Sequence, residues 1–126
     1  MRLKNVLIVV NNMERAIRFY KKIFGLQVVA NSEVNVIMSE GLVLQVKKIW
    51  EKVLKTDVIA KNNMTELYFK ESDMDNFLSK LKESEFEIEY VNEVTSDESG
   101  RRIVRFYDPD GNLIEVGTPF FNRGEQ

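Results

Sequence analysis

The chain of 126 residues contains no histidine and no cysteine. Without cysteine it can form no disulfide, no thiolate nucleophile and no thiolate-bound zinc site. Without histidine it has no imidazole base, no serine–histidine pair and no histidine-bound transition metal. We therefore expect acid–base chemistry, if there is any, to rest on carboxylates, and a bound metal to rest on oxygen ligands.

The sequence also contains only two prolines, has a net charge close to zero and lacks long apolar runs. A net charge of -2 gives no reason to expect a nucleic acid or an anionic membrane as partner. Arg2 and Lys4 precede only the short apolar run from Val6 to Val10, so we expect neither a signal peptide nor a membrane span. A composition of 44% hydrophobic and 30% charged residues is typical of a globular domain, which we expect in the cytoplasm.

The first half of the chain alternates strand and helix signals. β-branched residues predict a strand over Leu3–Val10, and Asn11 is expected to cap a helix with Glu14 as its capping-box partner. Gly25 is expected to end that helix. Three further strands are predicted, at Gln27–Ala30, Val34–Met38 and Leu42–Lys47.

The second half repeats this order. A strand is predicted at Thr65–Lys70, and Ser72 is expected to cap a helix with Asp75 at the capping-box position. Both helix starts and first strands recur at a constant spacing of about 61 residues, which indicates an internal duplication of a βαβββ unit. The last three strands are predicted at Glu87–Val91, Arg101–Tyr107 and Leu113–Gly117.

The duplication predicts one α+β domain over residues 1–126, with two βαβββ modules in tandem whose curved mixed sheets enclose a cleft. Module 1 covers about 1–47, a linker covers 48–64, and module 2 covers about 65–120. Helical spacing of apolar residues in the linker predicts a short helix. This helix either packs on the surface of the core or acts as a lid, ligand contact or dimer contact through Trp50.

Four polar residues stand among apolar neighbours at matching places in the modules. Asn5 and Glu66 lie in the first strands, and Gln45 and Glu115 lie in the last strands, at a spacing of about 70 residues. Because strand side chains alternate between faces, these four can converge in the cleft. Neighbours on the same faces would give it a mainly apolar lining, suited to a small organic ligand: Leu7, Val9, Val43, Tyr68, Ile103 and Leu113.

A tight turn precedes Glu115. Pro109 and Gly111 are typical turn residues, and a three-residue loop would place Arg105 directly opposite Glu115 on the neighbouring strand. A buried carboxylate needs a compensating charge, and Arg105 can supply it. A solvated strand face is an alternative for Arg101, Arg102 and Arg105, and it is expected more for Arg101 or Arg102 than for Arg105.

These features resemble the vicinal oxygen chelate superfamily, which includes glyoxalase I, extradiol dioxygenases, fosfomycin-resistance enzymes and bleomycin-binding proteins. The resemblance covers essentially residues 1–120 and lies in residues 11–14, Phe19-Tyr20, Phe24-Gly25-Leu26, Asp108–Asn112 and Ile114-Glu115. It implies that Asn5, Gln45, Glu66 and Glu115 stand where metal-dependent members carry ligands, usually His and Glu. Only Glu115 keeps that identity here. The resemblance also implies a homodimer.

Three functions remain open, and the sequence does not decide whether the protein is an enzyme. The first is a small-molecule-binding protein with no cofactor, related to bleomycin-resistance proteins. Its ligand-binding residues would be Arg105, Tyr68, Gln45, Asn5 and Trp50.

The alternative is a lyase or isomerase of glyoxalase type, with Glu115 or Glu66 as general base. It would use an oxygen-only site for Mg²⁺, Mn²⁺ or Ca²⁺, formed by Glu66, Glu115, Gln45 and Asn5. The third function is a scaffold without a ligand, in which the polar cluster is only structural.

Overall fold

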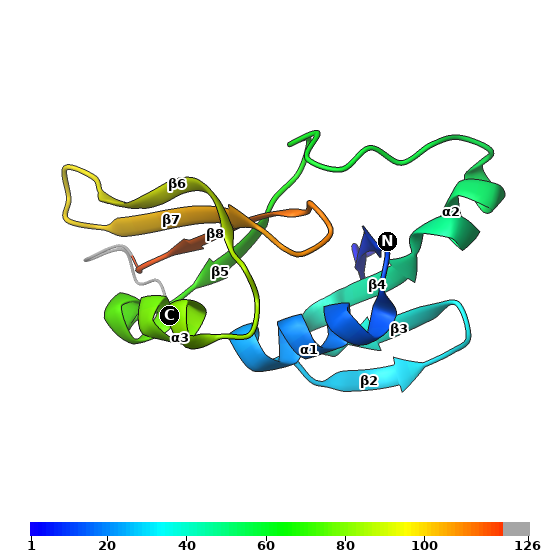
Figure 1. Ribbon diagram of the computed structural model, residues 1–126, viewed down its shortest axis with the longest axis horizontal. Helices are drawn as coiled ribbons and strands as arrows, with labels where there is room; N and C mark the ends of the chain where they lie inside the picture. Colours follow the sequence, from blue (N-terminus) through cyan, green and yellow to red (C-terminus); the bar gives the residue numbers. More distant parts are fainter. Residues whose placement is uncertain (120–126) are drawn as a thin grey trace. The chain divides into compact units, whose positions relative to one another are not determined.

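The computed structural model describes residues 1–119, and the chain divides into two compact units (Figure 1). Unit 1 spans Met1–Ala60, and unit 2 begins at Lys61, so the division falls inside the predicted linker. No helix in the described part of the chain is long and apolar enough to cross a membrane. Each unit is a βαβββ module with its own sheet.

Unit 1 has a four-stranded mixed sheet in the order β1-β4-β3-β2, with β1 parallel to β4 and the other pairs antiparallel. Its α1 carries the buried side chains that cover one face of the sheet, and α2 packs against β4 and β1. The elements are β1 (Val6–Val10), α1 (Met13–Phe24), β2 (Val28–Asn31), β3 (Asn35–Met38), a 3₁₀ turn (Ser39–Gly41), β4 (Leu42–Val46) and α2 (Lys47–Leu54).

Unit 2 repeats the topology, with the sheet order β5-β8-β7-β6 and β5 parallel to β8. The predicted α+β fold of two tandem βαβββ modules with mixed sheets is therefore confirmed, and neither sheet closes into a barrel. The elements are β5 (Leu67–Lys70), α3 (Met74–Glu83), β6 (Glu89–Ser96), β7 (Arg102–Tyr107) and β8 (Leu113–Gly117).

The two module helices each begin one residue later than predicted. The caps are Asn12 and Asp73, whose side chains accept from the backbone N–H three residues on at 3.0 and 3.1 Å. The predictions of Asn11 and Ser72 were wrong, because each stands beside a second good capping residue and sequence alone does not choose between them. Glu14 and Asp75 consequently stand two residues after the caps, and not at the capping-box position three residues after them. Gly25 ends α1 in the left-handed conformation, as predicted.

Strand boundaries agree with prediction to within one or two residues, except at the start of β1 and in β6. The latter spans Glu89–Ser96 rather than Glu87–Val91, and its pairing with β7 shifts register twice, after Tyr90 and after Asn92. Each shift is a bulge that breaks the alternation on which the prediction depended.

Each sheet buries one face under its own helix. In unit 2 the ring of Phe77 from α3 lies 6.3 Å from that of Phe106 in β7, which identifies the covered face. The fully buried residues of unit 1 include an edge-to-face pair in α1, Phe19 and Tyr20, with centroids 5.1 Å apart. The opposite face of the unit 2 sheet is called the site face below, because it carries the candidate residues.

Candidate functional site

The site face of unit 2 brings four predicted residues together. Tyr68 in β5 pairs with Glu115 in β8, which pairs with Arg105 in β7, so the three side chains form one row across the sheet. Glu66 lies two residues before Tyr68 and therefore has the same orientation. The covered face is formed by the intervening residues, such as Val104 and Phe106, which are fully buried.

Arg105 and Glu115 form the ion pair at the centre of this row. Arg105 Nε donates to Glu115 Oε1 at 2.8 Å, and Arg105 Nη1 donates to Asn92 Oδ1 at 3.1 Å. Glu115 is 8% exposed, so it is buried with its charge compensated by the guanidinium. The predicted register of Arg105 opposite Glu115 is confirmed.

The turn between β7 and β8 sets that register. Asp108 N donates to the carbonyl of Asn112 at 2.9 Å, which closes a three-residue loop. The Asp108 carboxylate accepts from the backbone N–H of Asp110 and of Asn112, both at 2.9 Å. Gly111 adopts a φ of 87°, a conformation that favours glycine. The turn sequence thus fixes which residue of β7 lies opposite Glu115.

Glu66 belongs to the same electrostatic cluster. Its pKa is raised above the ordinary value of 4.5, first by desolvation and then by the negative charge of Glu115, to which it also hydrogen-bonds. The positive charge of Arg105 acts to lower the Glu66 pKa, because it favours the ionised carboxylate. Glu66 therefore holds its proton to higher pH than an isolated glutamate would, which is the property of a proton donor or acceptor.

Tyr68 is contacted by Arg101, one of the two arginines for which a solvated face was expected as an alternative. Arg101 Nη2 donates to the Tyr68 hydroxyl at 2.6 Å, and the guanidinium carbon lies 5.5 Å from the ring centroid. Arg101 Nε donates to the Thr118 carbonyl at 2.9 Å. Gly117 makes room for this arrangement, since a Cβ there would stand 2.7 Å from Arg101 Nη2.

Arg102 makes a different contact from Arg101. Its guanidinium pairs with Asp75 of α3 at 2.7 Å, with the side chains 33% and 85% exposed respectively. Arg102 is thus a partly exposed residue on the opposite side of the strand from Arg101.

The other predicted polar residues belong to unit 1. Asn5 is exposed and directly precedes β1, whereas Gln45 is 3% exposed and donates from Nε2 to the Val34 carbonyl at 3.1 Å. By strand register, the unit 1 counterpart of Glu115 is Val43, because Val43 pairs with Leu7 as Glu115 pairs with Tyr68. The predicted equivalence of Gln45 and Glu115 was wrong, since counting along the chain does not determine how strands pair.

Trp50 lies in the predicted linker helix, which forms as α2. Its side chain is half-buried, and α2 packs against β4 and β1, as a surface helix would. The Glu51 carboxylate accepts from Val58 N–H at 2.9 Å and so holds the segment that follows. Val53 and Leu54 at the end of α2 are exposed.

The site face of unit 2 offers a divalent cation two carboxylates, Glu66 and Glu115, with a guanidinium beside them. Within residues 1–119 no group of three or more His, Cys, Asp or Glu side chains could hold a metal ion. One oxygen of Glu115 already accepts from Arg105, and Gln45 Nε2 donates to a backbone carbonyl. A guanidinium beside the carboxylate opposes the binding of a second cation.

Two residues of the site were missed by sequence reasoning. Arg101 had a usable signal, because Arg101, Ile103 and Arg105 alternate along one strand and share a face. Asn92 had none, because the bulges of β6 bring it opposite Arg105 in a way that strict alternation does not predict.

A family model described as Glyoxalase-like domain matches residues 3–120. The chain belongs to the glyoxalase-like domain family. This family and its structural relatives place the protein in the vicinal oxygen chelate superfamily, as the turn and the duplication predicted.

Solved structures share this glyoxalase-like fold over nearly the whole chain. A protein of unknown function from Agrobacterium tumefaciens is 26% identical, with a TM-score of 0.77 and coverage of 95% of both chains. A lactoylglutathione lyase from the same species is 20% identical, with a TM-score of 0.72 and coverage of 99% of this chain and 98% of that chain. A glyoxalase/bleomycin resistance protein/dioxygenase family enzyme from Burkholderia phytofirmans is 13% identical, with a TM-score of 0.75 and coverage of 91% and 96%.

Proposed function

We propose that this glyoxalase-like protein binds a small organic molecule on the site face of unit 2, without a metal. The observation that carries the proposal is the ion pair between Arg105 and Glu115, at 2.8 Å. The superfamily resemblance assigns Glu115 to a metal-ligand position, and here the positive charge beside it comes from the protein. A ligand carbonyl or carboxylate can be oriented by that guanidinium as it would be by a cation.

The surroundings of the ion pair suit a small ligand. Tyr68 is 41% exposed and offers an aromatic ring, while Ile103 and Leu113 are half-buried apolar neighbours on the same face. A mainly apolar surface with a few fixed polar groups is typical of small-molecule sites. The homodimer that the superfamily resemblance implies remains part of the proposal, whereas Asn5, Gln45 and Trp50 belong to unit 1 and are not used in it. No cofactor is required by it.

A second candidate function is proton transfer, and the raised pKa of Glu66 favours it. In this reaction the ligand is an α-hydroxycarbonyl compound: the Glu66 carboxylate takes the proton from the hydroxyl-bearing carbon and returns it to the former carbonyl carbon, while the hydroxyl proton moves to the former carbonyl oxygen. The Arg105 guanidinium stabilises the enolate formed in between. The net change is an isomerisation, so it needs no oxidant and no added water.

Two measurements test the binding function. Metal analysis of protein purified without chelator should find no stoichiometric divalent ion. One tightly bound ion per chain that is lost in Glu115→Ala would overturn the proposal. A thermal-shift screen of small carboxylic acids and carbonyl compounds should find ligands that raise the Tm of the wild type.

Matched variants separate site binding from general stabilisation. Arg105→Lys keeps the charge but loses the planar donor fork, so it should reduce the ligand-induced shift. Arg102→Lys, on the opposite side of the same strand, should leave the shift unchanged. Proton transfer is tested separately, by exchange of ligand C–H for deuterium in the wild type and its loss in Glu66→Gln.

A further inference from the structure

A concavity lies in unit 2, between α3 and β6. Its volume is about 370 Å³, within the range of small-molecule pockets. Tyr90 of β6 pairs with Phe106 of β7, so the pocket lies on the α3 side of the sheet, away from the site face. The lining residues are Leu78, Leu81, Lys82, Phe86, Ile88, Tyr90, Glu93 and Val94.

The pocket arises where module 2 carries smaller side chains than module 1. At the module spacing of about 61 residues, the positions of Tyr20, Ile23 and Phe24 correspond to Leu81, Ser84 and Glu85. In module 1, Tyr20 and Phe24 stack at 5.8 Å, and Ile23 is 1% exposed, so these side chains fill the helix–sheet space. α3 has 10 residues and α1 has 12, so module 2 also has fewer helix side chains to fill the space between its helix and its sheet.

Two features of the chain hold the pocket open. The bulges of β6 bend that strand at the sheet edge. After α3, the Ser84 hydroxyl donates back to the Leu81 carbonyl at 2.8 Å and accepts from Phe86 N–H at 3.3 Å. These bonds turn the chain so that Phe86 and Ile88 form one wall of the pocket.

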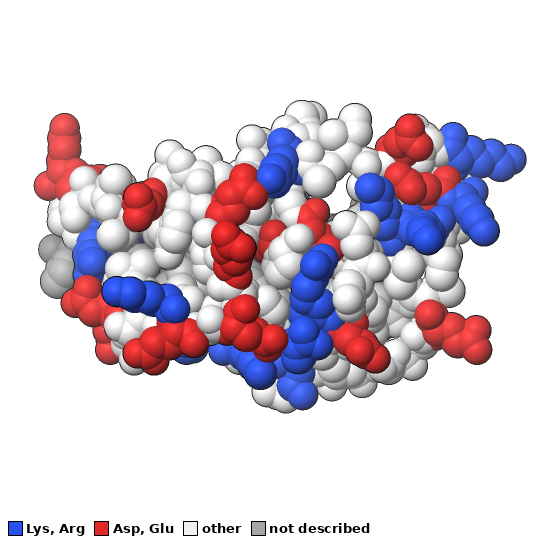
Figure 2. All heavy atoms as spheres, viewed as in Figure 1, with Lys and Arg blue, Asp and Glu red and all other residues white. Residues whose placement is uncertain are grey.

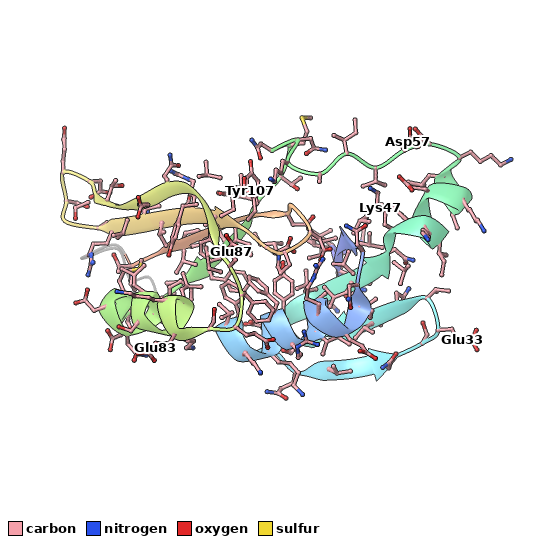
Figure 3. The ribbon with its side chains drawn as sticks, viewed as in Figure 1. Glu33, Lys47, Asp57, Glu83, Glu87 and Tyr107 are labelled. Atoms are coloured by element: carbon pink, nitrogen blue, oxygen red, sulfur yellow. The ribbon has the colours of Figure 1, made fainter. Side chains whose placement is uncertain are left out.

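The charge around the pocket is mostly negative. Residues 83–98 contain acidic side chains and no lysine or arginine, and Figure 2 shows acidic side chains over the segment before β6, where Figure 3 labels Glu87. Glu89 is neutralised by Lys61 at 2.6 Å, whereas Glu93 lines the pocket itself. The pKa of Tyr90 is raised by burial and by the charge of Glu93, so a neutral hydroxyl stands near a carboxylate. Lys82 is the one basic lining residue.

We propose that this pocket binds an organic amine with an apolar body. The body packs against Leu81, Phe86 and Val94, and the ammonium lies at Glu93 with the Tyr90 ring beside it. A cation fits better than an anion because the carboxylates of residues 83–98 outnumber the nearby lysines. This site is independent of the binding proposed for the site face.

Three probes of similar shape test the class of ligand. Phenethylammonium, 2-phenylethanol and 3-phenylpropionate are titrated separately into ¹⁵N-labelled full-length protein, and amide shifts are followed by NMR. The ammonium should bind with a Kd of about 1 mM and about 5-fold more tightly than the alcohol, and the carboxylate more weakly still. The shifts should cluster in α3 and β6.

Two variants and one control distinguish the expected contacts. Glu93→Gln should remove the preference for the ammonium while leaving alcohol binding unchanged. Leu78→Trp should fill the pocket and reduce the binding of all three probes. Glu98→Gln removes a carboxylate of the same acidic segment that does not line the pocket, and it should have little effect.

Several outcomes would overturn the proposal. Equal binding of the three probes, tightest binding of the carboxylate, or shifts confined to the site face would each contradict an amine site at Glu93. Shifts of the lining residues that depend on protein concentration without any probe would instead identify a second copy of the chain as the occupant.

Discussion

The two sheets share one topology but carry different chemistry on the face opposite their module helix. In unit 2 that face holds Glu66, Tyr68, Arg105 and Glu115, linked by an ion pair and a raised carboxyl pKa. At the matching register in unit 1 stand Asn5, Leu7, Ile37 and Val43.

This difference shows that duplication preserved the architecture and not the polar site. Strand pairing and helix packing depend on the buried residues of the covered face, which are apolar in both units. The other face is not constrained by that packing, so one module can hold a charged cluster while the other carries uncharged residues at the same positions. The proposed chemistry is therefore assigned to module 2.

The largest expected effect comes from moving the charge of unit 2 into unit 1. Val43→Glu places a carboxylate where the side chain is 7% exposed and no cation is paired with it, so the free energy of unfolding should fall by about 3 kcal/mol. Urea denaturation measures this. Adding Ile37→Arg, directly opposite in β3, should recover about 1 kcal/mol. Full stability of the single variant would show that the two faces are not chemically distinct.

Arg105→Ala should have the next largest effect, because it leaves Glu115 buried without its guanidinium. We expect a loss of about 2 kcal/mol of unfolding free energy, since Arg105 itself is 39% exposed. Arg102→Ala removes an arginine from the same strand whose partner Asp75 is 85% exposed, and it should cost less than about 0.5 kcal/mol. Equal losses in the two variants would contradict the central role of the Arg105–Glu115 pair.

Gly117→Ala should cost about 1 kcal/mol, because its Cβ would lie 2.7 Å from Arg101 Nη2 and 3.0 Å from the Tyr68 hydroxyl. Denaturation of the single and double variants checks this. Tyr68→Phe removes the hydroxyl, so Gly117→Ala should cost less unfolding free energy in the Tyr68→Phe variant than in the wild type. Additive effects would mean that Gly117 does not serve the Arg101–Tyr68 contact.

Glu66→Gln should produce the smallest change, visible only in the pH dependence of stability. The folded protein holds the Glu66 proton more tightly than the unfolded chain does, so this proton stabilises the fold fully below pH 4.5. The stabilisation is lost as the pH rises through the elevated pKa of the folded state. Unfolding free energies from pH 4 to 7 should therefore fall more steeply in wild type than in Glu66→Gln. Parallel curves would contradict the raised pKa.

Local sequence signals predicted most elements of the fold. Alternating and helical periodicities located the strands and helices. The Asp108–Asn112 turn placed Arg105 opposite Glu115, because a three-residue loop allows only one pairing register between β7 and β8. The same signals placed both helix caps one residue early, where two capping residues stand side by side. They also missed the course of β6, whose bulges follow neither periodicity.

The candidate site was predicted only where short-range geometry determined it. The Arg105–Glu115 pair follows from one hairpin, whereas the Arg101–Tyr68 contact joins the residue before β7 to β5, far apart in the chain. The supposed match of Gln45 with Glu115 failed because the register of the parallel pairs β1–β4 and β5–β8 depends on hydrogen bonds between distant segments.

The sequence by itself determined the repeated βαβββ order, the turn before Glu115 and the absence of imidazole chemistry, since each depends on residue types or on neighbours along the chain. Tertiary structure decided which polar residues meet. Packing sets the register of parallel strands and the bulges of an edge strand, and these bring Asn92 to Arg105 and Arg101 to Tyr68. It also decided that the space filled by Tyr20 and Phe24 in module 1 remains a pocket in module 2.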